Sequence, residues 1–179
     1  MQTEFQLQRI IDIVRRLRAP DGCPWDRVQT NHDIAKYLLE EAHEVIDAIH
    51  SGSPDALREE LGDLLFHILF LACIAEEERK FSISDVMAEI IEKMTRRHPH
   101  VFGQTSVNSV QEVKDNWEEI KKGEYRKKGI EPGLLDGIPR SMPALMKAQE
   151  MGRKAARTGF DWDKTEGVIL KVEEEWAEL

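Results

Sequence analysis

Two pairs of acidic residues in this sequence have the spacing that places both members on one face of a helix. Glu41 and Glu44 form the first pair, and Glu60 and Asp63 form the second. Residues at i and i+3 are neighbours on a helix surface. Two antiparallel helices joined by a short loop pack side by side, so the four carboxylates are expected to converge. Such a cluster needs protons or a hard divalent cation, and oxygen ligands favour Mg²⁺ or Mn²⁺ over a structural zinc.

The segment around the second pair adds a prediction about burial. Residues 59–74, EELGDLLFHILFLACI, are apolar on almost every side after Glu60, which predicts a helix in the protein interior. A buried, ionised Asp63 is costly unless it is paired or binds a metal. His67 lies one turn later, where it either orients Asp63 or is a satisfied core histidine. Gly62, between the two acids, leaves room for another group to approach the backbone.

Simpler interpretations of the same residues stay open. A glutamate pair on a helix is most often solvated, so Glu41 and Glu44 alone also fit an exposed face. A di-iron carboxylate bundle requires two Glu-x-x-His elements. Glu40 and His43 supply one, but the second acidic helix offers only an i, i+4 spacing, which disfavours this alternative.

Positive charge gathers at the end of a later helical segment, KMTRRHPH. Lys93 and Arg97 share one helix face there, with Arg96 and His98 beside them. Cations at a helix C-terminus complement the helix dipole, which is the simpler explanation. A phosphate ligand that bridges a metal to the protein would need the same groups.

A second candidate for ligand contact lies downstream, where Trp117 and Lys121 are one helical turn apart. Trp117 either belongs to the core or stacks against a base while Lys121 meets a phosphate. The sequence has no Walker loop and no glycine-rich dinucleotide fingerprint. Metal and basic side chains would therefore have to hold any bound phosphates.

The elements that must position these groups are helices separated by short breaks. Apolar residues at helical spacing place helices at 5–18, from Asn31 or Asp33 to 50, at 55–79, from Ser84 to 98, at 109–128 and at 141–157. The stretches APDGCPWD and GIEPGLLDGIPRSMP are expected to be loops. Ser53 is expected to cap the third helix, with Pro54 at its first position, and Ser84 to cap the fourth without a capping box. Because no segment alternates as a strand does, the predicted fold class is all-α, a helical bundle.

The bulk composition limits the function classes. The formal net charge of −9 argues against a general nucleic-acid binder or a membrane-surface protein. Two cysteines, Cys23 and Cys73, form no disulfide framework and suggest a reducing compartment. The N-terminal segment lacks the features of a signal peptide, and the apolar run from Leu64 to Ala75 is too short to span a bilayer. We therefore expect a cytoplasmic protein that binds neither nucleic acid nor membrane.

A faint repeat links the two ends of the chain. CPWDRVQT precedes LLEEAHEV, and GFDWDKTE precedes KVEEEWAEL, so each copy has a Trp-Asp pair before a Glu-Glu-x-x-Glu helix. A solvated acidic helix end also explains the second copy. The alternative is that a duplicated module begins near residue 159 and is incomplete at Leu179.

Several segments, taken in order, resemble the MazG family of nucleoside triphosphate pyrophosphohydrolases, within the all-α NTP pyrophosphatase superfamily. They are CPWD, LLEEAHEVIDAI, EELGDLLFHILF, KMTRRHPHVFG, NWEEIKKGE and LLDGIPRSMPALMKAQ. The resemblance covers nearly the whole chain. It implies a dimer of helical bundles, a requirement for Mg²⁺, and hydrolysis of nucleoside triphosphates to monophosphate and pyrophosphate.

The resemblance also implies roles for individual residues. The family's Glu-Glu-x-x-Glu and Glu-x-x-Asp motifs imply that the metal ligands are Glu41, Glu44, Glu60 and Asp63, with Glu40 as an additional acid. Lys93, Arg97, Trp117 and Lys121 match positions that contact nucleotide in the family, and we add Arg96 and Trp25 to the substrate-binding set.

The reaction implied is attack of water at the α-phosphorus, with Glu40 or Glu44 taking the proton. Lys93, Arg97 and Lys121 would stabilise charge on the leaving oxygens. Residues 1–130 would form the catalytic module, 131–158 a linker and helix, and 159–179 the start of an incomplete second module. The alternative class is a non-catalytic, dimeric helical interaction module whose acids only bind a cation.

Overall fold

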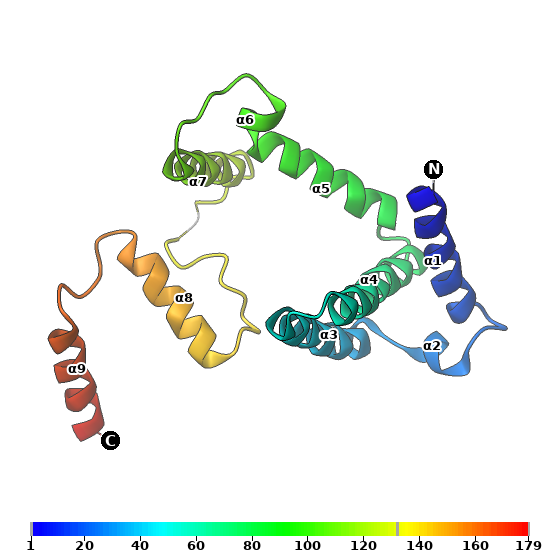
Figure 1. The fold of residues 1–179 in the computed structure, drawn as a ribbon, viewed down its shortest axis with the longest axis horizontal. Helices are drawn as coiled ribbons and strands as arrows, with labels where there is room; N and C mark the ends of the chain where they lie inside the picture. The colour runs from blue at the N-terminus through cyan, green and yellow to red at the C-terminus, as the bar shows by residue number, and fades with distance from the viewer. Residues whose placement is uncertain (1, 132, 179) are drawn as a thin grey trace. The chain divides into compact units, whose positions relative to one another are not determined.

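The computed structural model of the chain describes residues 2–131 and 133–178 (Figure 1). Every regular element in these ranges is a helix, which confirms the all-α prediction. Residues up to Phe102 form one compact unit, and residues from Gly103 onward form a second. Within the described ranges, no helix combines the length and the apolar character that crossing a membrane requires.

The first unit is built around a hairpin of two long helices. Its helices are α1 (Gln2–Arg18), α2 (Pro24–Val28), α3 (Asn31–Ser51), α4 (Pro54–Glu77), α5 (Ile83–Arg97) and α6 (Pro99–Phe102). The hairpin joins α3 to α4, which lie side by side in Figure 1. α1 contacts α4 and α2, whereas α5 contacts α4 and α6. The hairpin is therefore the element against which α1 and α5 pack, and these two helices carry α2 and α6.

The hydrophobic core lies where α1, α3 and the C-terminal half of α4 meet. Its buried members are Val14, Ile34, Leu69, Phe70, Cys73 and Ile74. Val14 and Phe70 are each only 1% exposed. All buried residues of α4 lie between Leu69 and Ala75, so the interior position predicted for this helix holds only for that half.

The start of α3 differs from the prediction in the identity of its cap. Thr30, rather than Asn31 or Asp33, is the capping residue. The Thr30 hydroxyl accepts a hydrogen bond from the Asp33 N–H, and the Asp33 carboxylate accepts one from the Thr30 N–H at 3.0 Å. Two of the unpaired donors at the helix start are satisfied in this way.

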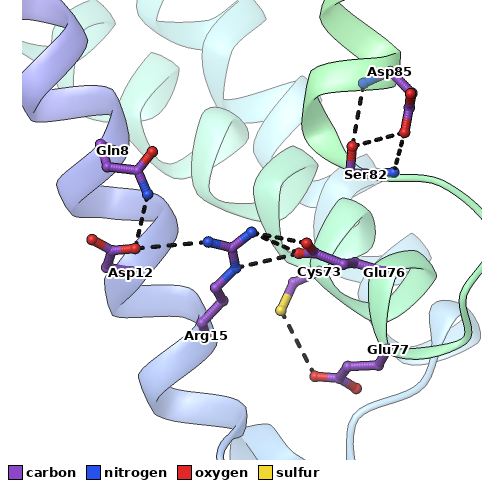
Figure 2. Close-up of polar contacts among 8 residues, drawn as sticks. All are labelled: Gln8, Asp12, Arg15, Cys73, Glu76, Glu77, Ser82 and Asp85. Carbon is purple, nitrogen blue, oxygen red and sulfur yellow. Dashed lines mark hydrogen bonds and ion pairs between the residues drawn. The ribbon is translucent and has the colours of Figure 1, made fainter.

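The starts of α4 and α5 give one confirmation and one correction. Ser53 caps α4 and Pro54 follows it at the first helical position, as predicted. Ser82, rather than Ser84, caps α5 and forms a capping box with Asp85, drawn in Figure 2. The prediction that α5 lacks a capping box is wrong because the cap is two residues earlier than predicted, which places Asp85 rather than Met87 at the third position.

The loop predicted at APDGCPWD contains the short helix α2, which begins at Pro24. The chain reaches it through a tight turn in which the Cys23 N–H donates to the Leu17 carbonyl at 2.8 Å. A Cβ atom on Gly22 would lie 2.3 Å from the Arg16 carbonyl oxygen. The close approach of the two backbone segments therefore requires glycine at this position.

Replacement of Gly22 by alanine is expected to lower the free energy of unfolding by about 1–3 kcal/mol, because the end of α1 has to shift. Urea unfolding measures the change. The matched control is G62A: no described atom lies within 4 Å of an added Cβ there, and a helix gains about 0.5–1 kcal/mol from alanine in place of glycine. A G22A protein as stable as the wild type would show that this turn tolerates a side chain.

The second unit contains α7 (Val110–Lys127), α8 (Ala144–Ala156) and α9 (Thr165–Ala177). The first two agree with the helices predicted at 109–128 and 141–157. The linker predicted between them has no regular helix among its described residues, and Pro132 lies outside these residues. α9 follows the second Trp-Asp pair, as the repeat requires. The division into a catalytic module at 1–130, a linker and helix at 131–158 and a second module from 159 stays a prediction.

Candidate functional site

The α3–α4 hairpin brings three of the predicted ligands together. Glu41 from α3 and Glu60 and Asp63 from α4 each offer one carboxylate oxygen, and these atoms all lie within 4.8 Å of one another. The tight connection through Gly52, which ends α3 at a φ of 70°, sets the register that aligns the two acidic pairs. Glycine reaches this left-handed conformation without the strain that a side chain adds.

Glu44 joins the same cluster through Glu60. Loss of hydration, then the negative charge of Glu44 and a hydrogen bond between the two carboxyl groups, raise the pKa of Glu60 above its ordinary value. Two carboxyls that share a hydrogen bond need a proton or a cation between them. Three of the four predicted metal ligands therefore converge and Glu44 adjoins one of them, Glu60; a set of oxygen ligands of this kind would suit Mg²⁺ or Mn²⁺.

The predicted burial of Asp63 is wrong, because this residue is exposed. The N-terminal half of α4 is covered by α3 but not by α1, and apolar side chains such as Leu61 and Ile68 remain 48% and 41% exposed there. Desolvation of Asp63 thus gives no reason to invoke a cation. The reason that remains is the close approach of several like charges, on a surface that a bulky ligand can reach.

His67 lies beside Glu41 rather than in the predicted contact with Asp63. Its Nε2 is 3.4 Å from Glu41 Oε1, and its ring stacks on Tyr37 with 5.8 Å between the ring centroids. The Nδ1 atom is buried and has no hydrogen-bond partner among the described residues. The ring therefore positions the Glu41 carboxylate. An approach of another group to the Gly62 backbone stays a prediction, since no described atom lies within 4 Å of an added Cβ.

The predicted cations lie on α5, which contacts α4 but not α3. Lys93 is 3.7 Å from Glu89, and Arg96 is 2.5 Å from Glu92, both one turn earlier in the same helix. Arg97 is half-buried at the last position of α5. The ion pairs described for Lys93 and Arg96 are with glutamates of α5 itself, so the approach of these cations to the carboxylate cluster stays a prediction.

The remaining predicted substrate residues occupy two other helices. Trp117 and Lys121 are half-buried on α7 in the second unit. Lys121 lines a cavity of about 480 Å³ there, together with Tyr125 and Arg126. Trp25 is 63% exposed on α2 of the first unit. Glu40, the alternative base, is exposed on α3.

Sequence reasoning missed two arginines of α1 that hold the first unit together. Arg15 makes a bidentate contact with Glu76 at 2.9 Å (Figure 2), and Arg18 pairs with Glu77 at 2.7 Å. The one sequence feature that pointed to these ion pairs is the cluster of basic residues in the last turn of α1. Such clusters are explained equally well by their favourable interaction with the helix dipole.

Cys73, next to Glu77 in Figure 2, is a buried free thiol, as the sequence suggested. Burial, followed by the charge of Glu77, raises its pKa to about 11. The thiol is therefore protonated at neutral pH and serves as a small apolar core group.

Comparison with known proteins agrees with this geometry. A profile of the MazG nucleotide pyrophosphohydrolase domain matches residues 29–102, which include α3, α4 and α5. The nucleoside triphosphate pyrophosphohydrolase of Escherichia coli K12 is 48% identical over 97% of this chain and 66% of its own length. The Thermotoga maritima nucleoside triphosphate pyrophosphohydrolase/pyrophosphatase MazG is 42% identical over 96% of this chain and 65% of its own.

A solved structure shares the fold. The crystal structure of a mazG-related protein from Thermotoga maritima matches with a TM-score of 0.56 and 27% identity, covering 64% of this chain and 98% of that one. The fold and the cluster define an all-α protein with a group of carboxylates on a helical hairpin that could hold a metal ion. The chain belongs to the MazG nucleotide pyrophosphohydrolase family. It spans about two thirds of the length of these two curated relatives.

Proposed function

We propose that this protein hydrolyses nucleoside triphosphates to nucleoside monophosphate and pyrophosphate, with Mg²⁺ as its cofactor and Mn²⁺ as a substitute. The observation that supports this most directly is the convergence of the half-buried Glu41 and Glu60 with the exposed Asp63 on a helical hairpin. A triphosphate carries several negative charges, so it approaches an acidic surface only when a cation is bound there. The MazG relatives bear the name of this activity.

The roles of the acidic residues follow from their positions. Glu41, Glu44, Glu60 and Asp63 would hold Mg²⁺, which neutralises phosphate charge and lowers the pKa of water when bound. Of the two candidate bases, we favour Glu44 over Glu40, because its hydrogen bond with Glu60 places it in the cluster. Glu44 would accept the proton of the water that attacks the α-phosphorus, and His67 would keep Glu41 oriented.

We further propose a homodimer that completes the site. Large apolar side chains stay exposed on α3, α4 and α5, among them Leu39 at 59%, Ile49 at 56% and Ile91 at 66%. Exposed apolar faces of this extent are typical of subunit interfaces. Pairing through them would bury these faces and allow Lys93, Arg96 and Arg97 of one copy to approach the carboxylates of another. Trp117 and Lys121 would contact the nucleotide.

The free thiols of Cys23 and Cys73 support the cytoplasm as the compartment.

Incubation with a panel of ribo- and deoxyribonucleoside triphosphates tests the proposal. With Mg²⁺, equal amounts of monophosphate and pyrophosphate are expected, and a chelator should abolish their release. Chromatography of the nucleotides together with a pyrophosphate assay measures both products. Diphosphate with orthophosphate would indicate cleavage at the γ position and contradict the proposal.

The second candidate function is a non-catalytic dimeric interaction module whose acids only bind a cation. The exposed apolar faces of α3, α4 and α5 favour it as much as they favour an enzyme dimer. The same nucleotide panel separates the two, because this module would bind Mg²⁺ and leave every triphosphate intact.

A further inference from the structure

The guanidinium of Arg18 joins three parts of the first unit. Its Nε and Nη2 donate to the Glu77 carboxylate of α4 at 2.8 and 2.7 Å. Its Nη1 donates to two backbone carbonyls, those of Asp26 at 2.8 Å and Gln29 at 3.1 Å. Asp26 lies in α2 and Gln29 is the C-terminal cap of α2. One side chain at the end of α1 therefore ties α2 to α4.

The surroundings of Arg18 suit arginine and no other residue. Its side chain is only 7% exposed, and its guanidinium carbon lies 5.1 Å from the centre of the Phe70 ring. A planar fork can contact an aromatic face while donating in its own plane to a carboxylate and two carbonyls. A lysine ammonium has the charge but lacks the flat geometry, so it cannot replace all four hydrogen bonds.

Arg18 helps to hold α2 in position, together with the tight turn that leads into it. A helix from Pro24 to Val28 is far too short to be stable alone. Among the described elements, α2 contacts only α1. Two large side chains of α2 are open to solvent, Trp25 at 63% and Val28 at 65% exposed, and Trp25 is the aromatic one. An exposed indole on a fixed helix is a ready surface on which a nucleotide base can stack.

We propose that Arg18 is a positioning residue that holds Trp25 as a stacking platform for the base of the nucleoside triphosphate. This inference rests on the proposed function. α3 begins shortly after α2, and Glu41 lies ten residues into α3 from Asn31, which corresponds to about 15 Å along the helix axis. A nucleoside triphosphate with its phosphates at the carboxylates that extended back along α3 would place its base near the start of α3, next to the end of α2 in the chain.

The test compares R18K, W25A and the R18K/W25A double variant. Calorimetry measures the binding of the non-hydrolysable α,β-imido analogues of ATP, GTP, CTP and UTP, each with Mg²⁺. R18K and W25A should each raise the dissociation constant of the analogues about tenfold, as expected when the stacking of the base is lost. The double variant should be no weaker than W25A, because Arg18 acts through Trp25. In turnover, KM should rise while kcat changes by less than about twofold.

A second readout is hydrogen exchange of the 20–30 segment, which should become faster in R18K and stay unchanged in W25A. The matched control is R15K, because Arg15 forms the parallel contact with Glu76 and does not touch α2. It should leave both binding and exchange unchanged. If circular dichroism shows that R18K is unfolded, E77Q replaces it in the same measurements. The affinity of E77Q for the analogues should fall about threefold, because a neutral glutamine forms a weaker hydrogen bond with the guanidinium than the carboxylate does.

Three results would overturn the inference. The first is that W25A binds the analogues as tightly as the wild type. The second is that a folded R18K does so although hydrogen exchange in the 20–30 segment is faster. The third is that the affinity losses of R18K and W25A add up in the double variant. A wild-type protein that binds the analogues with this pattern but releases no pyrophosphate would refute the proposed reaction and leave the positioning role intact. A wild-type protein that binds none of the analogues would refute both.

Discussion

Replacement of Asp63 by alanine is expected to reduce pyrophosphate release about a thousandfold, because it removes one of three oxygens that converge within 4.8 Å. The remaining carboxylates of Glu41 and Glu60 would hold the cation in altered geometry, and a displaced cation cannot align a triphosphate for attack. The helices should survive, since the Asp63 side chain is exposed and the core does not depend on it. Steady-state turnover and circular dichroism, measured on the same preparation, check both expectations.

The matched control for this variant is D55A. Asp55 lies in the first turn of the same helix, and its side chain is 84% exposed and pairs only locally with Arg58 at 2.8 Å. Exposed pairs of this kind contribute little to stability. D55A should therefore retain wild-type turnover. Near-normal turnover of the Asp63→Ala protein would remove Asp63 from the site and with it the proposed cation centre.

Truncation of Phe70 to alanine should lower the free energy of unfolding by about 3–5 kcal/mol, as expected for a buried phenylalanine. Phe70 is 1% exposed and lies in the cluster formed by α1, α3 and α4. Its ring also lies beneath the Arg18 guanidinium, so the variant loses packing and a cation–π contact together. Urea unfolding monitored by circular dichroism measures the loss.

F5A is the control for core truncation, because Phe5 is 64% exposed on α1. Surface substitutions usually change stability by less than about 0.5 kcal/mol, so F5A should unfold near the wild-type midpoint. Similar midpoints for F70A and F5A would contradict the core assigned to α1, α3 and α4.

The local chemistry of the helices was largely readable from the sequence. Helical spacing of apolar residues located the main helices, and proline with serine located the start of α4 at Ser53 and Pro54. The i, i+3 spacing of the acids was enough to predict that Glu41, Glu60 and Asp63 meet, because one tight hairpin fixes the register of two adjacent helices. The caps at Thr30 and Ser82 were missed because a polar residue one to three positions later in each segment could also cap a helix.

What the sequence did not reveal depends on neighbours that are distant along the chain. An all-round apolar helix predicts burial, yet in α4 only the half that meets α1 is buried, and Asp63 lies outside it. His67 was assigned to Asp63 by proximity in sequence, whereas the neighbouring helix provides its partner, Glu41. The contacts of Arg18 could not be predicted, because its backbone acceptors at Asp26 and Gln29 are in place only once α2 has folded against α1.

The closeness of the acidic pairs along the chain has a kinetic consequence. Glu41 and Asp63 belong to a single hairpin turned at Gly52, so bringing them together closes only a short loop. Contacts of this local kind form early when a chain folds. We therefore expect the hairpin to form before the folding transition state, so divalent cations that bind at the proposed site should accelerate refolding more than they slow unfolding, as stopped-flow refolding with and without Mg²⁺ would measure.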